Sequence, residues 1–194
     1  MRVIRSAWGV VAISVIASMS IAFGITVLIT PEYESRAQMF VSTSNQIRSD
    51  VYETNVFSQQ VVGSYAELAT GTVLASKVVS DLGLDLTPAE LTEKVTTSYS
   101  PATVVFDIVA TDNSPELARD IANTMGTELS ELVSAIEVST NGDAPSHEVK
   151  FYSLAEASDS PISPNTVMYL AIGAVVGLLI GSALVLARHR IASR

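Results

Sequence analysis

The sequence predicts a membrane-anchored α/β protein, in which two transmembrane helices flank one extracytoplasmic domain with a small sheet of about three strands and packed helices. Three observations predict this architecture. Two long apolar runs carry no charge, all 20 Asp and Glu residues lie between them, and the intervening segment alternates stretches of strand period with stretches of helix period.

The two apolar runs cover residues 7–29 and 167–187, which are 23 and 21 residues long. A helix needs roughly 20 apolar residues to cross the hydrocarbon core, so both runs are long enough. A cleaved signal peptide is the alternative for the first run, because Ser20-Ile21-Ala22 resembles a cleavage site. Signal peptides have apolar stretches of only about 7–15 residues, and we therefore expect an uncleaved anchor.

The charges predict the orientation in the cell membrane. Cationic residues close to membrane-spanning segments stay in the cytoplasm, and both ends of this chain are purely basic. The topology-setting residues are Arg2, Arg5, Arg188, Arg190 and Arg194. We expect a cytoplasmic tip (1–6), a first transmembrane helix (7–29), an extracytoplasmic domain (30–166), a second transmembrane helix (167–187) and a cytoplasmic tail (188–194).

The middle segment has the length of one domain and a strongly acidic balance. It holds 137 residues, with six Lys and Arg against 20 Asp and Glu, which gives a charge of −14. Such a charge disfavours binding to nucleic acid or another polyanion. The chain has no cysteine, which excludes disulfides and thiol chemistry.

Three stretches of this domain have strand character. Residues 33–42 alternate between two faces, and residues 103–111 have one largely buried face formed by Val104, Phe106, Ile108 and Ala110. Residues 148–155 return to extended character after a loop over 138–146. The first and third predicted strands adjoin the two transmembrane helices, so one sheet would bring both anchors together.

The remaining segments have helical spacing. Residues 51–82 predict two helices broken at 70–72 and ended by Gly83, and a capping box at Thr87 with Pro88 and Glu90 starts a short helix to Val95. A long helix is expected to run to residue 137, with Asn113 or Ser114 as cap and Pro115 first. Its apolar stripe is Leu117, Ile121, Met125, Leu129, Leu132 and Ile136.

No residue constellation predicts an enzyme. His147 lies near a loop and His189 in the basic tail, neither with a second catalytic partner, and no Gly-Lys dipeptide marks a phosphate loop. We predict no catalytic residue, no metal ligand and no cofactor.

The second transmembrane helix carries Gly173, Gly177 and Gly181 at four-residue spacing. This places the three glycines on nearly one face, where another helix can approach at backbone distance. The expected partner is Ala17 and Gly24 of the first helix, or a neighbouring subunit; chance is the alternative, because glycine is common in membrane helices.

A proline-containing juxtamembrane segment, residues 157–166, precedes that helix. Pro161 and Pro164 have fixed φ angles and no backbone donor, which predicts a stiff, extended approach to the bilayer. An ordinary linker has the same composition.

Taken together, four segments resemble the Wzz-type chain-length determinants, or polysaccharide co-polymerases, including the short transmembrane modulators of bacterial tyrosine kinases. They are the strand after the first helix, the run Thr111-Asp-Asn-Ser-Pro-Glu-Leu-Ala-Arg-Asp-Ile-Ala-Asn123, the motif Pro161-Ile-Ser-Pro-Asn165 with Ser163 inside it, and the glycine-rich second helix. Their order and position, spread over nearly the whole chain, make the match fairly specific.

The resemblance implies a non-enzymatic membrane regulator of capsular polysaccharide or exopolysaccharide chain length or export. Such a protein would form a homo-oligomeric scaffold and act with a polymerase, with export proteins, with membrane lipids and with a separate cytoplasmic tyrosine kinase. By the same resemblance, Pro161, Ser163 and Pro164 would form the proline motif. The helix packing would be carried by Gly173, Gly177 and Gly181. The outer domain is shorter than in long family members, so their helical stalk is expected to be missing.

The alternative function is a two-helix membrane sensor whose outer domain binds a ligand. Only six residues precede the first apolar run and seven follow the second, so we expect any signalling output, or any kinase, to be a separate protein.

Overall fold

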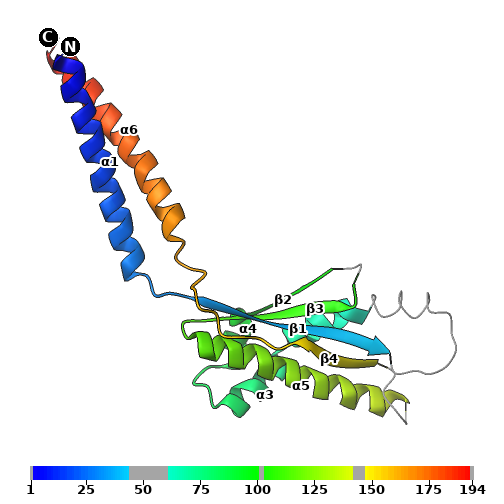
Figure 1. Cartoon of the computed structure of the whole chain (residues 1–194). Coiled ribbons are helices and arrows are strands. Elements are labelled where there is room, and N and C mark those ends of the chain that lie inside the picture. The colour runs from blue at the N-terminus through cyan, green and yellow to red at the C-terminus, as the bar shows by residue number, and fades with distance from the viewer. Residues whose placement is uncertain (1, 44–60, 101–102, 142–146, 193–194) are drawn as a thin grey trace. The chain divides into compact units, whose positions relative to one another are not determined.

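The computed structural model describes residues 2–43, 61–100, 103–141 and 147–192 (Figure 1). The chain forms two compact units, one made of Met1–Pro31 with Ile162–Arg194 and one made of Glu32–Pro161. The first unit contains the two terminal helices and the second is the outer domain.

The terminal unit consists of α1 (Arg2–Leu28) and α6 (Thr166–Ala192), which pack against each other. Within them, Trp8–Leu28 and Thr166–Arg188 are long and apolar enough to cross a membrane, judged by length and composition. Most of their large apolar side chains are exposed, as expected of helices that face lipid rather than a protein core.

The outer domain has one antiparallel sheet of four strands in the order β2-β3-β1-β4. The strands are β1 (Tyr33–Thr43), β2 (Val95–Tyr99), β3 (Val105–Asp112) and β4 (His147–Ser153). The α/β fold class is therefore confirmed, and β1, β3 and β4 lie at the three predicted strands. The sequence reasoning missed β2, because only Val95 in its sequence Val-Thr-Thr-Ser-Tyr is a buried apolar residue and the alternation is weak.

β1 lies in the middle of the sheet, between β3 and β4. It pairs with β3 from Tyr33↔Asp112 to Phe40↔Val105, and with β4 from Gln38↔Ser153 to Thr43↔His147. The strand that follows α1 and the strand that precedes α6 are thus hydrogen-bonded neighbours. The first described residue of β1 and the last of β4 lie towards the same end of the sheet.

Helices cover one face of this sheet. Residues 61–69 are helical, and α3 (Thr72–Leu82), α4 (Pro88–Lys94) and α5 (Pro115–Asn141) follow, with α5 packed on β1, β3 and β4 (Figure 1). The core between them contains fully buried side chains from the sheet and from α5, namely Met39, Phe106, Ile108, Ile121, Met125 and Leu129. Burial of such apolar side chains is the main stabilising contribution to the domain.

The predicted ends of α3 and the predicted start of α4 are present in the structure. The break at 70–72 is present, with Gly71 as the N-cap of α3, and Gly83 ends α3 in the left-handed conformation at φ 60°. The Thr87 capping box starts α4 as predicted. Residues 51–60 of the predicted helical segment lie outside the described residues.

α5 differs from its prediction at the C-terminal end. It continues to Asn141, so residues 138–141 of the predicted loop are helical, while 142–146 lie outside the described part. Ile136 is 46% exposed, which corrects its placement in the buried stripe. Ile121, Met125 and Leu129 of the predicted stripe are fully buried. The buried face also includes small residues that let the helix approach the sheet, such as Ala118, Ala122 and Gly126, and it continues to Val133.

Candidate functional site

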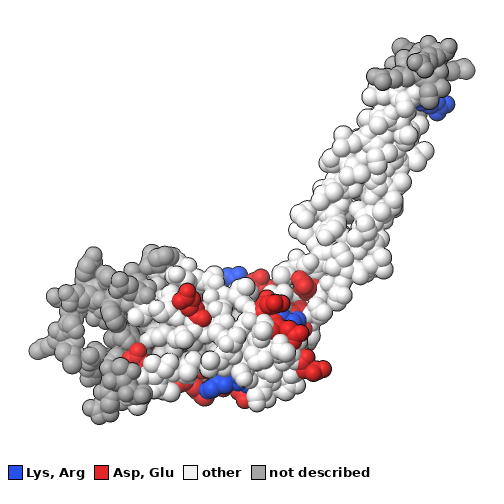
Figure 2. All heavy atoms as spheres, turned by 180° about the vertical axis from the view of Figure 1, so that it is seen from behind, with Lys and Arg blue, Asp and Glu red and all other residues white. Residues whose placement is uncertain are grey.

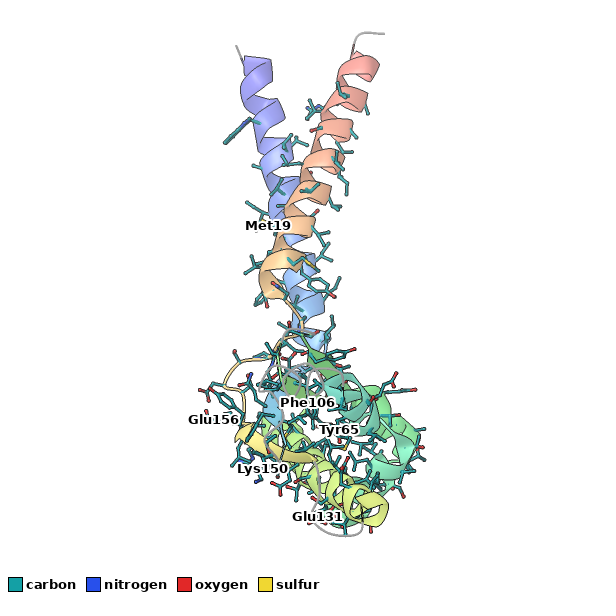
Figure 3. The ribbon with its side chains drawn as sticks, turned by 90° about the vertical axis from the view of Figure 1, so that its right-hand side faces the viewer. Met19, Tyr65, Phe106, Glu131, Lys150 and Glu156 are labelled. Atoms are coloured by element: carbon teal, nitrogen blue, oxygen red, sulfur yellow. The ribbon has the colours of Figure 1, made fainter. Side chains whose placement is uncertain are left out.

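The three glycines of α6 face α1 and are buried. A Cβ added at Gly173 would lie 2.9 Å from Ala22 Cβ, and one at Gly181 would lie 2.8 Å from Val11 Cα. The tightest position is Gly177, where an added Cβ would lie 2.5 Å from Val15 Cα. The two helix backbones therefore meet along this face at a distance that only glycine permits (Figure 3 labels Met19, beside Gly173).

The predicted partner residues on α1 are wrong. Ala17 is exposed, and an added Cβ at Gly24 would have nothing within 4 Å. The face that meets α6 instead carries small residues at four-residue spacing, namely Ser14, Ser18 and Ala22. The four-residue spacing of small residues could have predicted this face of α1. The prediction followed the position of glycine instead and therefore chose the wrong side of the helix.

Two hydroxyl groups on α1 are satisfied within their own helix. Thr26 Oγ1 donates to the Phe23 carbonyl at 2.7 Å, and Ser20 Oγ donates to the Ile16 carbonyl at 2.9 Å. Because lipid offers no hydrogen-bond partner, such bonds allow polar side chains in a membrane-spanning helix.

The juxtamembrane proline motif leads directly into α6. Pro161 is exposed, and Ser163 and Pro164 are half-buried and joined by a cis peptide bond. Asn165 is the N-cap of α6, since its Oδ1 accepts a hydrogen bond from the Met168 N–H at 3.1 Å. The sequence reasoning quoted Asn165 only as part of the motif and assigned it no role.

The topology-setting arginines lie near the two chain termini, at the start of α1 and the end of α6. Arg2 and Arg5 belong to α1, Arg188 and Arg190 belong to α6, and Arg194 lies outside the described residues. The orientation that they predict stays a prediction.

The strand-to-helix junction of the resemblance is built around Asp112, which is 8% exposed. Its Oδ1 accepts from the Ser114 N–H at 3.0 Å, and its Oδ2 accepts from Lys94 Nζ at 2.9 Å. Burial raises the pKa of Asp112, but the hydrogen bond from Lys94 and those from the backbone N–H groups of Asn113 and Ser114 outweigh it and lower the pKa. Asp112 therefore ties α4 to β3 and prepares the start of α5.

Ser114, one of the two predicted caps, is the N-cap of α5. Its Oγ accepts from the Leu117 N–H at 3.2 Å, and its carbonyl accepts from the Ala118 N–H. The predicted position of Pro115 as the first helical residue agrees with this start.

The second face of the sheet carries a polar network, and no described helix packs on it. Arg36 donates to Asp107 and to Glu34, both at 3.1 Å, and Gln38 donates to Asp107 at 2.9 Å. The hydrogen bond to Glu34 is the main reason that the pKa of Arg36 is raised, with the charge of Asp107 adding to it.

Ion pairs use every basic side chain of the outer domain in its described part. The pairs are Arg36 with Glu34 and Asp107, Lys77 with Glu128, Lys94 with Asp112, Arg119 with Asp120, and Lys150 with Glu148. The surface left over is acidic: Figure 2 shows acidic side chains scattered over this domain with few basic ones. The arrangement offers an anionic ligand no unpaired cation in the described regions of the domain.

Within the described ranges, no group of three or more His, Asp or Glu side chains is placed to hold a metal ion. The side chains of His147 and His189 lie outside the described part of the chain.

Comparisons with known proteins match this arrangement. Residues 1–82 match the family model described as "Wzz: Chain length determinant protein". The resemblance to the Wzz family is confirmed. The Wzz-like chain is 29% identical to the "Probable capsular polysaccharide biosynthesis protein YwqC" of Bacillus subtilis over 153 residues, which are 77% of this chain and 59% of that protein.

A second relative is matched along almost the whole chain. The "Capsular polysaccharide biosynthesis protein CpsC" of Streptococcus pneumoniae is 28% identical over 193 residues, which cover 96% of this chain and 80% of the relative. The Wzz-like chain thus spans less than two thirds of the first of these relatives and most of the second.

A solved structure described as "full-length bacterial polysaccharide co-polymerase" has the same fold. Its TM-score is 0.54 at 10% sequence identity, and the match covers 95% of this chain and 94% of that one. The likeness therefore includes both terminal helices and the outer domain.

Proposed function

We propose that this chain is a non-enzymatic membrane regulator that sets the chain length or export of a capsular polysaccharide or exopolysaccharide. The observation that carries the proposal is the match to a relative named for capsular polysaccharide biosynthesis over 96% of the chain. The Wzz family match to residues 1–82 supports the same role. The regulator lies in the cytoplasmic membrane with its central domain outside, as the two apolar terminal helices and the basic ends favour.

The finer parts of the proposal concern assembly and partners. The chain acts as a homo-oligomeric scaffold beside a polysaccharide polymerase and export proteins, and a separate cytoplasmic tyrosine kinase is a further partner. The α1–α6 packing through Gly173, Gly177 and Gly181 supports the view that each chain forms a rigid helix pair, which neighbouring chains would contact through its exposed apolar faces.

The charge of the outer domain limits what it can touch directly. Its described basic side chains are all paired with carboxylates, so a strongly anionic polymer would meet mainly negative charge. Direct contact with the polymer is therefore expected to favour an uncharged one.

Deletion of the gene, followed by sizing of the surface polysaccharide on a gel, tests the proposed function. The expected result is a changed length distribution or amount, restored by the intact gene on a plasmid. An unchanged distribution and amount would reject the proposal and favour the ligand-binding sensor.

A further inference from the structure

The segment that leaves the outer domain towards α6 is held by side chains. The ladder between β4 and β1 ends at Ser153, and Leu154 to Asp159 form no regular structure apart from a bend at the end. Ala155 is nevertheless only 4% exposed. A buried backbone outside the sheet needs other hydrogen-bond partners.

Asn123 of α5 supplies both partners of Ala155. The Ala155 N–H donates to Asn123 Oδ1 at 2.8 Å, and Asn123 Nδ2 donates to the Ala155 carbonyl at 3.1 Å. One side-chain amide thus satisfies the donor and the acceptor of a single residue, as a neighbouring strand would.

Ser35 of β1 holds the next residue from the sheet side. Its Oγ donates to the Glu156 carbonyl at 2.9 Å, and Ser35 itself is 2% exposed (Figure 3 labels Glu156). The stretch 155–156 is therefore fixed both to the helix layer and to the central strand. We call Asn123, Ser35, Ala155 and Glu156 the exit clamp.

The exit clamp differs from a strand pairing in how it can open. Its bonds belong to two side chains, so they can open without breaking the β1–β4 ladder or the core between the sheet and α5. Local openings of this kind occur far more often than global unfolding. The segment that would be freed continues through the proline motif into α6.

We propose that Asn123, supported by Ser35, is a positioning residue that couples α5 of the outer domain to the segment leading into α6. Closed, the exit clamp passes a displacement of α5 on to that segment; open, it leaves the outer domain folded and the segment free. The part of this proposal that concerns polymer length rests on the proposed function above.

Hydrogen exchange on the purified full-length chain in detergent tests the clamp itself. Asn123→Leu keeps the branching and the number of side-chain heavy atoms and removes both bonds, and Asn123→Asp keeps the shape and only the acceptor for the Ala155 N–H. We expect exchange at Ala155 to rise about tenfold or more in the first variant and less in the second, with β1 and β3 unchanged. Thr127→Ala, one turn further along α5 and exposed, is the matched control, because it removes only a hydroxyl bond to the Asn123 backbone carbonyl and leaves the Asn123 side-chain amide in place. Wild-type exchange at Ala155 in both Asn123 variants would overturn the clamp.

Sizing of the polysaccharide from cells that carry the same variants tests the coupling. We expect a shifted length distribution with Asn123→Leu and the wild-type distribution with Thr127→Ala. Ile121→Val serves as a stability control, because it removes a core methylene without touching the clamp and should lower Tm without shifting the distribution.

The two hypotheses fail in different ways. If gene deletion changes the distribution but Asn123→Leu does not, the coupling is overturned and the proposed function survives. If deletion itself changes nothing, the proposed function fails and takes the polymer-length part with it, while the exchange experiment still decides whether the clamp exists.

Discussion

Replacing Gly177 with alanine should weaken the α1–α6 pair. The new Cβ would lie 2.5 Å from Val15 Cα and 2.8 Å from the Ser14 carbonyl oxygen, and both are backbone atoms that cannot rotate away. Ordinary contact begins at 3.4 Å, so the helices must separate by about 0.9 Å at this point. Overpacking of this kind costs about 1–3 kcal/mol, partly offset by roughly 1 kcal/mol gained in helix propensity.

The chain offers its own control and its own probe. Gly24→Ala makes the same chemical change on α1 with nothing within 4 Å, so it should leave the pair unchanged or slightly more stable. Trp8 is the sole tryptophan and the chain has no cysteine, so a dye on Ala187→Cys can accept energy transfer from Trp8 alone.

The assay is the loss of this energy transfer as sodium dodecyl sulfate is added to the protein in a mild detergent. Gly177→Ala should shift the midpoint to a lower dodecyl sulfate fraction, and Gly24→Ala should not. Equal midpoints for Gly177→Ala and wild type would refute the close backbone contact.

Three further changes test individual residues. The lowered pKa of Asp112 stabilises the fold above the unfolded pKa of about 3.9, and this stabilisation is lost as the pH falls through the folded pKa. The Tm advantage of wild type over Asp112→Asn should therefore shrink below about pH 4, and a constant Tm difference would contradict this prediction. Burial, with the nearby charge of Glu137, raises the pKa of Tyr65 from 10.0 to about 12, so wild type should lose stability relative to Tyr65→Phe as the pH rises from 10 to 12, and parallel melting curves over that range would exclude this. Asn165→Ala should cost the start of α6 about 1 kcal/mol and speed amide exchange at Met168, whereas wild-type exchange there would show that the cap contributes nothing.

The sequence predicted the elements whose pattern is local and strong. Thr87 with Glu90 forms a capping box whose two hydrogen bonds depend on four neighbouring residues, and the structure contains both bonds. The strands with clear alternation, such as β3 with Phe106 and Ile108, were readable for the same reason.

The incorrect sequence predictions have a common cause: a contact between distant segments produces only a weak pattern in the sequence of either segment alone. β2 is a polar strand that exists because β3 offers it a partner, so its own sequence gives a weak signal. The side of α1 that meets α6 depends on how two helices rotate against each other, and Ala17 and Gly24 were chosen for size without that information. The ion pairs of the sheet face, such as Arg36 with Asp107, join residues 71 positions apart.

Several polar residues of the family motifs bind backbone atoms where one element of the fold meets the next. Asp112 and Ser114 start α5, Asn165 starts α6, and Asn123 holds the exit of the outer domain. Each of these polar side chains binds backbone at a junction between elements, so the motifs identify the fold. Because Asn123 and Asp112 already spend their hydrogen bonds on backbone or on Lys94, the motifs leave little capacity for a sugar. Under the proposed function, selectivity for a particular polymer would therefore come from other surfaces of the outer domain or from a partner protein, and variants of the motif residues should change how far a polymer grows rather than which polymer is made.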